Sequence, residues 1–149
     1  MTELSFSNVT EADFETLLAL RIRVMREHLE RLGRFHPDRA RKHFRRGFEP
    51  QFMRKIWVGA DMVGVVSLKP SNDELELEHF YLNPDHQSKG LGGTVLRLLI
   101  DEANEQGLSI YLGVLKQSPA ARFYERHGFH KVDEEEWDVF YRRDVGVVD

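Results

Sequence analysis

The 149-residue sequence predicts an α/β fold, in which a mixed central β-sheet is flanked by about four helices. Two observations predict this class. Segments in which apolar and polar residues alternate, as in strands, are interspersed with segments whose apolar residues recur every three or four positions, as in helices. In addition, strands expected at 75–82 and 108–114 are separated by a helix, and such a connection joins parallel strands by a right-handed crossover. The length favours a single domain over residues 1–149.

The first strand and helix occupy the N-terminal segment. Leu4 and Phe6 alternate with serines, which predicts a strand. Thr10 followed by Asp13 resembles a capping box and predicts the start of a helix. Gly33 suits the position just beyond the end of that helix. Its apolar positions include Phe14, Leu17, Leu18, Met25 and Leu29.

A second helix is expected from Pro37, because proline fits the first helical position. Its apolar stripe is narrow and consists of Ala40, Phe44 and Phe48. The remaining face is basic and consists of Arg39, Arg41, Lys42, His43, Arg45 and Arg46. This face has three interpretations: a solvated surface, the wall of a substrate site, or a nucleic-acid contact. No aromatic base-stacking set accompanies it, so nucleic acid ranks last.

The rest of the chain alternates strands with two further helices. A loop is expected at 70–73, and Ser118 followed by Pro119 predicts a short helix with serine as its cap. The longer helix ends at Gly107 and should bury Leu91, Val95, Leu98, Leu99 and Ala103. The expected strands lie at 56–58, 62–68, 75–82, 108–114, 129–132 and 139–142.

Composition excludes several classes of protein. The chain has no cysteine, which excludes disulfides, thiolate metal sites and a cysteine nucleophile. No segment approaches the roughly 20 apolar residues of a membrane span and no signal pattern is present, so we expect a cytoplasmic protein without membrane contact. The seven histidines lack ligand spacing, so no metal is expected. The net charge of −4 argues against a nucleic-acid partner, although residues 21–55 hold twelve basic and only four acidic side chains.

A glycine-rich turn at 87–93 follows the strand at 75–82 and leads directly into a helix. The first backbone N–H groups of a helix lack intrahelical partners, and the helix dipole adds positive charge there. Both effects favour a phosphate, and glycine lets the backbone approach it closely. The spacing matches neither the P-loop nor the dinucleotide-binding fingerprint. The turn therefore predicts a pyrophosphate site, with a turn required only for packing as the alternative.

Two blocks of sequence together resemble the GNAT N-acetyltransferase superfamily. Gln87-x-x-Gly90-x-Gly92 resembles the loop by which that family binds the pyrophosphate of acyl-CoA. The segment 118–129 resembles its N-x-x-A-x-x-F-Y-x-x-x-G-F helix. The resemblance implies the GNAT fold and an enzyme that transfers an acetyl group from acetyl-CoA directly to a primary amine of a small molecule or a peptide. A homodimer through the C-terminal strand pair is also possible.

The resemblance also implies roles for individual residues. Backbone N–H groups along Phe80 to Leu82 would bind pantetheine and polarise the thioester carbonyl, and Tyr124 would be the general acid. The alternative is a core aromatic residue, as Phe-Tyr on a short helix often is, but within this motif the catalytic role is favoured. Ser118 stands where the family usually has asparagine, so one cofactor contact is weakened or rerouted. The implied cofactor-binding set is Phe80, Tyr81, Leu82, Gln87, Ser88, Lys89, Gly90, Leu91, Gly92, Gly93, Ser118 and Tyr124.

Three glutamates are candidates for the base that deprotonates the amine. Glu74, Glu76 and Glu78 share one face of the strand, because side chains alternate along it. Glu74 fits a solvated edge best. By resemblance, Glu76 and Glu78 each match a glutamate used by some family members. A water relay or an amine that arrives neutral remains open.

Two other classes of function remain open. A non-catalytic module of the same fold that senses CoA or a nucleotide would retain the glycine-rich turn without the chemistry. A nucleic-acid binder that uses the basic helix ranks low. If that helix instead lines the acceptor site, its charge would favour acceptors that carry a carboxylate or a phosphate.

Overall fold

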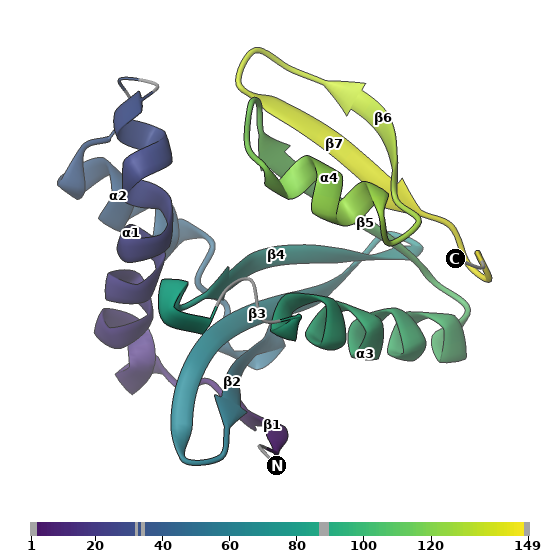
Figure 1. Ribbon diagram of the computed structural model, residues 1–149, viewed down its shortest axis with the longest axis horizontal. Helices are drawn as coiled ribbons and strands as arrows, with labels where there is room; N and C mark the ends of the chain where they lie inside the picture. Colours follow the sequence, from purple (N-terminus) through teal and green to yellow (C-terminus); the bar gives the residue numbers. More distant parts are fainter. Residues whose placement is uncertain (1–2, 32, 34, 87–89, 148–149) are drawn as a thin grey trace. The chain divides into compact units, whose positions relative to one another are not determined.

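The computed structural model describes residues 3–31, 33, 35–86 and 90–147 (Figure 1). The predicted order of strands and helices is confirmed. In the described residues, no helix is long and apolar enough to cross a membrane. The elements are β1 (Leu4–Asn8), η1 (Glu11–Asp13), α1 (Phe14–Arg31), α2 (Pro37–Arg46), η2 (Pro50–Phe52), β2 (Met53–Val58), β3 (Asp61–Ser71), β4 (Glu74–Leu82), η3 (Pro84–His86), α3 (Leu91–Gln106), β5 (Ser109–Leu115), α4 (Ala120–Glu125), β6 (His130–Glu134) and β7 (Asp138–Arg143).

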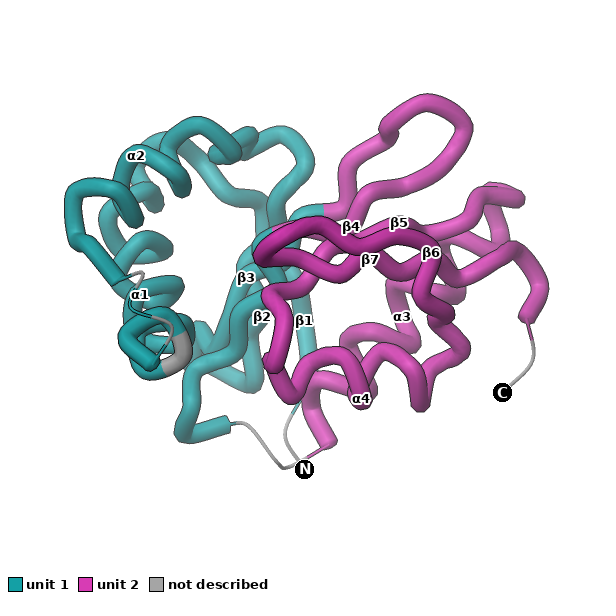
Figure 2. The backbone as a smooth tube through the Cα atoms, turned by 90° about the horizontal axis from the view of Figure 1, so that it is seen from above, with its two compact units in different colours: residues 1–67, 79–87 teal, residues 68–78, 88–149 magenta. Residues whose placement is uncertain are grey.

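The strands form a sheet in the order β1-β2-β3-β4-β5-β7-β6. β4 pairs with β5 in parallel, with Glu74 opposite Ser109, which confirms the predicted crossover through α3. The β1–β2, β2–β3, β5–β7 and β6–β7 pairs are antiparallel. The chain divides into two compact units, residues 1–67 with 79–87 and residues 68–78 with 88–149 (Figure 2). They are called unit 1 and unit 2 below.

The core of unit 1 joins α1 and α2 through three phenylalanine rings. Phe14 of α1 lies 5.5 Å from Phe44 and 5.1 Å from Phe48, measured between ring centroids. Phe44 is completely buried, and the predicted stripe of Ala40, Phe44 and Phe48 is confirmed. Burying a phenylalanine side chain contributes about 1.5–3 kcal/mol, so this cluster is a main source of stability in the unit.

The predicted ends of α1 and the predicted start of α2 are also confirmed. The backbone N–H of Thr10 donates to the carboxylate of Asp13 at 2.8 Å, as in a capping box. Gly33 follows α1 with a φ of +68°, and its N–H donates to the carbonyl of Glu30 at 2.9 Å. Pro37 is the first residue of α2.

The core of unit 2 lies between α3 and the strands β4 and β5. α3 packs against β5, whose Ile110 and Leu112 are buried, as are Leu75 and Leu77 of β4. The predicted inclusion of Leu98 in the apolar face is wrong, because 40% of that residue is exposed. Leu96 and Ile100 are buried instead, so the stripe is rotated toward them. The buried residues of α3 are Val95, Leu96, Leu99, Ile100 and Ala103.

Two predicted boundaries are corrected by the structure. The loop expected at 70–73 is shorter, because Pro70 and Ser71 belong to β3 and only Asn72 and Asp73 form the turn. Asn72 has a φ of +56°, a conformation that asparagine tolerates in tight turns. α4 begins at Ala120 rather than at Pro119. Ser118 nevertheless accepts a hydrogen bond from the N–H of Ala120 at 3.2 Å.

Gly64 in β3 allows the backbone of β4 to approach closely. A Cβ at this position would lie 2.4 Å from the carbonyl oxygen of Tyr81. Because the obstacle is backbone, we expect Gly64→Ala to lower the free energy of unfolding by about 1–3 kcal/mol in urea denaturation. At Gly113 the same substitution meets the ring edge of Phe140 at 2.9 Å, which is a side chain that can shift. Gly113→Ala should therefore cost less, and the opposite ranking would contradict the explanation.

Candidate functional site

The glycine-rich turn opens α3 without a side-chain cap. Gly90 occupies the N-cap position with a φ of +76°, in the left-handed region that favours glycine. Its carbonyl accepts the first intrahelical bond, from the N–H of Thr94 at 3.1 Å. The N–H groups of Leu91, Gly92 and Gly93 precede that bond, so they have no carbonyl partner within the helix. This arrangement suits an anion at the start of α3. The predicted Gln87, Ser88 and Lys89 lie outside the described residues.

His127 lies against this first turn of α3. Its Nδ1 donates to the carbonyl of Phe123 at 2.8 Å. A Cβ on Gly93 would lie 3.3 Å from Nε2 of His127, so glycine makes room for the imidazole. The end of α4 and the start of α3 therefore meet at these two residues. The sequence does not predict the contact, because nothing in the spacing of residues brings position 127 to position 93.

Tyr124, the predicted general acid, is a buried residue of α4. Only 7% of it is exposed, and its ring packs edge-on against Phe123 and Phe129 at centroid distances of 5.2 and 5.4 Å. The core interpretation of the ring is therefore confirmed. The catalytic role of the phenol oxygen stays a prediction.

The three glutamates of β4 differ in their partners. Leu75 and Leu77 are buried, whereas the glutamates between them are partly exposed, as the strand period predicts. Glu74 accepts hydrogen bonds from Nε of Arg142 at 2.9 Å and from the hydroxyl of Ser109 at 3.1 Å. The bond from Arg142 is the main reason that the pKa of Glu74 lies below its usual value. The solvated edge predicted for Glu74 is thus wrong, and the residue is an ion-pair partner within unit 2.

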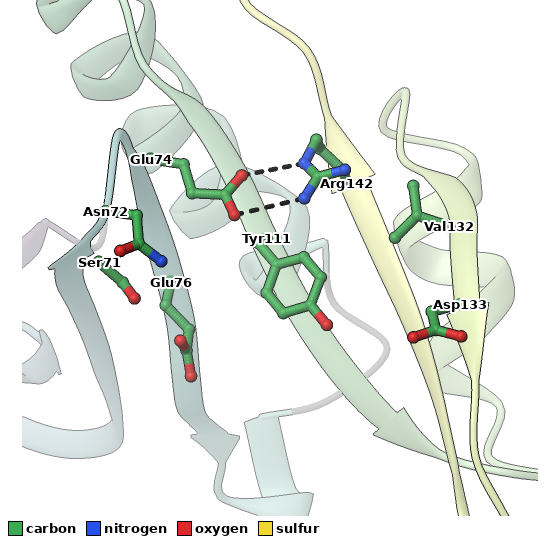
Figure 3. A pocket seen from close by; sticks show the side chains of 8 residues that line it. All are labelled: Ser71, Asn72, Glu74, Glu76, Tyr111, Val132, Asp133 and Arg142. Carbon is green, nitrogen blue, oxygen red and sulfur yellow. Dashed lines mark hydrogen bonds and ion pairs between the residues drawn. The ribbon is translucent and has the colours of Figure 1, made fainter.

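Glu76 lines an open hollow of about 420 Å³ on unit 2 (Figure 3). It lies opposite Tyr111 in the register of β4 and β5. The pKa of Tyr111 is raised, first by burial and then by the charges of Asp133 and Glu76. Carboxylates that disfavour a phenolate also attract cations, so the hollow suits a cationic or amine ligand. Its lining residues are Ser71, Asn72, Glu74, Glu76, Tyr111, Val132, Asp133 and Arg142.

The predicted thioester-binding segment, Phe80 to Leu82, belongs to unit 1. The N–H of Asn83, just after it, donates to the carbonyl of Val63 at 2.7 Å and ties the end of β4 to β3. The hydroxyl of Tyr81 accepts a hydrogen bond from Nε of Arg21 at 3.2 Å. One residue earlier in the chain than Phe80, His79 has a φ of +50°, which is uncommon for a residue with a side chain. Sequence analysis gave no sign of this conformation.

His79 is held in that conformation by the core of unit 1. Its Nε2 lies 3.1 Å from the carbonyl of Gly47, and its ring stands edge-on to Phe44 at 5.3 Å. Burial lowers the pKa of His79 to about 4, and repulsion by Arg21 is the next cause. Repulsion by His43 also lowers the pKa of His79, whereas the hydrogen bond to Gly47 and the charge of Glu49 raise it. His79 is therefore neutral at pH 7.

The basic face of α2 is partly neutralised by acidic residues of unit 1. Arg41 donates to Glu15 at 2.9 Å, and Arg45 pairs with Glu11. The guanidinium of Arg45 also lies 4.4 Å from the ring centroid of Phe14. About half of each arginine side chain is exposed, so these pairs contribute little stability. The contacts support the interpretation of this face as a solvated surface.

Comparisons with known proteins assign the class and the family. The fold matches those of N-acetyltransferases of known structure. The family model for the acetyltransferase (GNAT) family matches residues 17–129. The chain therefore belongs to the GNAT acetyltransferase family. A search of curated protein sequences gave no match.

Similar solved structures share the fold at low sequence identity. The PaiA N-acetyltransferase of Thermoplasma acidophilum, in complex with coenzyme A, is 18% identical with a TM-score of 0.77, over 95% of this chain and 99% of that one. The ribosomal-protein-alanine N-acetyltransferase of Escherichia coli is 19% identical with a TM-score of 0.73, over 99% and 97%. A GNAT acetyltransferase of Staphylococcus aureus is 16% identical with a TM-score of 0.73, over 96% and 99%.

The neutral state of His79 predicts a loss of stability in acid. A histidine in the unfolded chain takes up a proton near pH 6.5, whereas the folded protein resists protonation of His79 until about pH 4. Stability is therefore complete above pH 6.5 and falls as the pH drops toward 4, by up to about 3 kcal/mol. Urea denaturation across this range measures the slope.

The substitution His79→Asn tests the origin of that slope, because asparagine tolerates a positive φ and does not titrate. We expect the variant to lose most of the slope between pH 6.5 and 4. His130 is exposed on β6 and provides the control, since His130→Asn should retain the wild-type profile. An unchanged slope in His79→Asn would show that another group causes it.

Proposed function

We propose that the chain, acting as one catalytic domain over residues 1–149, is an acetyl-CoA-dependent N-acetyltransferase that transfers the acetyl group directly to a primary amine. The observation that carries the proposal is the start of α3, where Gly90 leaves three successive N–H groups without a side-chain cap. The coenzyme A complex of the similar T. acidophilum enzyme and the family match support the same cofactor here. The acceptor is a small molecule or a peptide.

The start of α3 fits the pyrophosphate of CoA in charge. Backbone N–H groups and the helix dipole bind an anion without any lysine or arginine, so the net charge of −4 does not oppose binding. Gly90, Leu91, Gly92 and Gly93 would hold the pyrophosphate, together with Gln87, Ser88 and Lys89. Ser118 would contribute a hydroxyl to the pantetheine arm.

The bound cofactor would supply an acetyl thioester. Backbone N–H groups along Phe80 to Leu82 would donate hydrogen bonds to its carbonyl oxygen, where negative charge develops during attack. A free alkyl amine has a pKa of about 10, so Glu76 or Glu78 would accept its proton, directly or through water. Tyr124 would donate a proton to the departing sulfur. The absence of cysteine agrees with direct transfer rather than an acyl-enzyme.

Substitution of Tyr124 separates an enzyme from a CoA-sensing module. Tyr124→Phe removes only the phenol oxygen and keeps the ring that packs on Phe123 and Phe129. We expect kcat to fall about 100-fold, whereas the Kd for acetyl-CoA stays within about two-fold of wild type. Isothermal titration measures Kd, and release of free CoA in the presence of a panel of amines measures kcat.

The control is Tyr141→Phe, which removes the hydroxyl of a similarly buried tyrosine in β7 and should leave kcat unchanged. A kcat of Tyr124→Phe equal to that of the wild-type protein would show that Tyr124 is not the general acid. No binding of acetyl-CoA at millimolar concentration would overturn the proposed function. Binding without consumption of acetyl-CoA by any amine would instead support the sensing module.

The pH dependence of kcat/KM identifies the base. If Glu76 is the base, Glu76→Gln loses the acidic limb of the profile and Glu78→Gln keeps it, and the reverse holds if Glu78 is the base. Glu74→Gln should leave the limb in place and lower stability by about 1–3 kcal/mol, because the partly buried guanidinium of Arg142 loses its carboxylate partner and one acceptor oxygen is replaced by a donor. Retention of the limb in both Glu76→Gln and Glu78→Gln would favour a water relay or a neutral amine.

A further inference from the structure

Arg21 is a buried cation in the core of unit 1. Only 7% of the residue is exposed. Its Nε donates to the hydroxyl of Tyr81 at 3.2 Å, and its guanidinium carbon lies 5.9 Å from the centroid of that ring. Its Nη1 is buried and has no hydrogen-bond partner among the residues that the structure describes. A buried donor without an acceptor costs free energy, and a buried charge without a counter-ion costs more.

No carboxylate compensates this charge in the part of the chain that the structure describes. Arg23 and Arg26, on the same helix, pair with Asp85 and Glu30, whereas Arg21 forms no ion pair. Its neighbour His79 is neutral and hydrogen-bonded to Gly47. Glu49 is the carboxylate among the groups that shift the pKa of His79, and in the described residues it forms no ion pair with Arg21. Arg21 is thus a buried positive charge without an ion-pair partner among the described residues.

We propose that Arg21 binds a carboxylate of the amine acceptor, so that the acceptor is an amino-carboxylate compound such as an amino acid or a peptide with an acidic group. This assignment rests on the proposed acetyl transfer and names the substrate class of that reaction. The guanidinium is a planar fork of donors that matches a carboxylate geometrically. One such group compensates one negative charge, whereas a phosphate dianion would need a second cation, which neutral His79 does not supply.

The position of Tyr81 links this anion site to the predicted chemistry. Its side chain ends at the guanidinium of Arg21, and its backbone lies in the segment 80–82 that is predicted to polarise the thioester carbonyl. All of these groups belong to unit 1. A carboxylate on Arg21 would therefore lie beside the side chain of a residue whose backbone N–H is predicted to polarise the thioester carbonyl. The acceptor would be anchored by its acid while its amine reaches the acetyl group.

Matched acceptors test the proposal. Dipeptides with a free or an amidated C-terminus have amines of similar basicity and differ in the carboxylate. Amidated peptides that carry Glu or Gln extend the test to a side-chain acid. Wild-type protein should prefer the carboxylate member of at least one pair about 10- to 100-fold in kcat/KM. Arg21→Met should reduce that preference to about two-fold or less, mainly through KM, and Arg21→Lys should retain part of it. Arg26→Met, a surface variant of the same helix, should keep the wild-type preference.

A second measurement does not depend on turnover. Propionate should raise the Tm of the wild-type protein, and the uncharged propionamide should not. Without ligand, Arg21→Met should melt at or above the wild-type temperature, because it removes an uncompensated buried charge. The added propionate should then have no effect. If Arg21→Met does not fold, Arg21→Gln replaces it in both measurements.

Failure of the acceptor assignment and failure of the proposed function are distinguishable. Acetyl transfer without a carboxylate preference, or with a preference unchanged in Arg21→Met, would overturn the role of Arg21. A lower Tm in ligand-free Arg21→Met, with no effect of propionate on the wild-type protein, would show a structural arginine and also overturn it. Absence of acetyl-CoA binding would overturn the proposed function, whereas the propionate result would still decide whether Arg21 binds a carboxylate.

Discussion

The contact of His79 with Gly47 and Phe44 is the interaction on which the arrangement of α2 against the end of β4 in unit 1 depends. A residue with a side chain is held at a φ of +50° within a strand, and such a conformation costs of order 1–3 kcal/mol unless its surroundings enforce it. The carbonyl of Gly47 and the ring of Phe44 enforce it here. Both partners come from α2 and the residue after it, so the packing of α2 on α1 fixes the backbone of β4. Two residues further along, Tyr81 meets Arg21.

Local signals in the sequence were sufficient for most of the fold. Both ends of α1 and the start of α2 follow from Thr10, Gly33 and Pro37. Each of these residues acts on the backbone only a few positions away in the sequence. The parallel β4–β5 pair follows from chain order and the handedness of crossovers. The boundary at Pro70 was mispredicted. Proline excludes a strand only at positions where the sheet needs a backbone N–H donor, and elsewhere a strand can contain it. Leu98 was misplaced because helical spacing allows more than one rotation of an apolar stripe.

The candidate site was less predictable, because its contacts join residues far apart in the sequence. The glycine-rich turn was predictable, since helix start and glycine spacing are local. The contacts of His127 with Gly93, of Glu74 with Arg142 and of Arg21 with Tyr81 are not encoded in any spacing. Burial decides their chemistry: it makes His79 neutral and turns Glu74 from a solvated edge residue into an ion-pair partner. The roles of Tyr124, Glu76 and Glu78 rest on the family resemblance alone.

The arginines of the basic segment at 21–55 are of two kinds, which differ in their exposure to solvent. Arg41 and Arg45 are half-exposed, paired with glutamates and screened by solvent, so they select little. Arg21 is one charge among twelve, but water cannot screen a buried guanidinium, and its interaction with an anion is correspondingly stronger. Lysine would not serve as well, because a guanidinium can donate one N–H to Tyr81 and still present others to a carboxylate. Selectivity for an acidic acceptor would thus come from one buried arginine rather than from the many exposed ones.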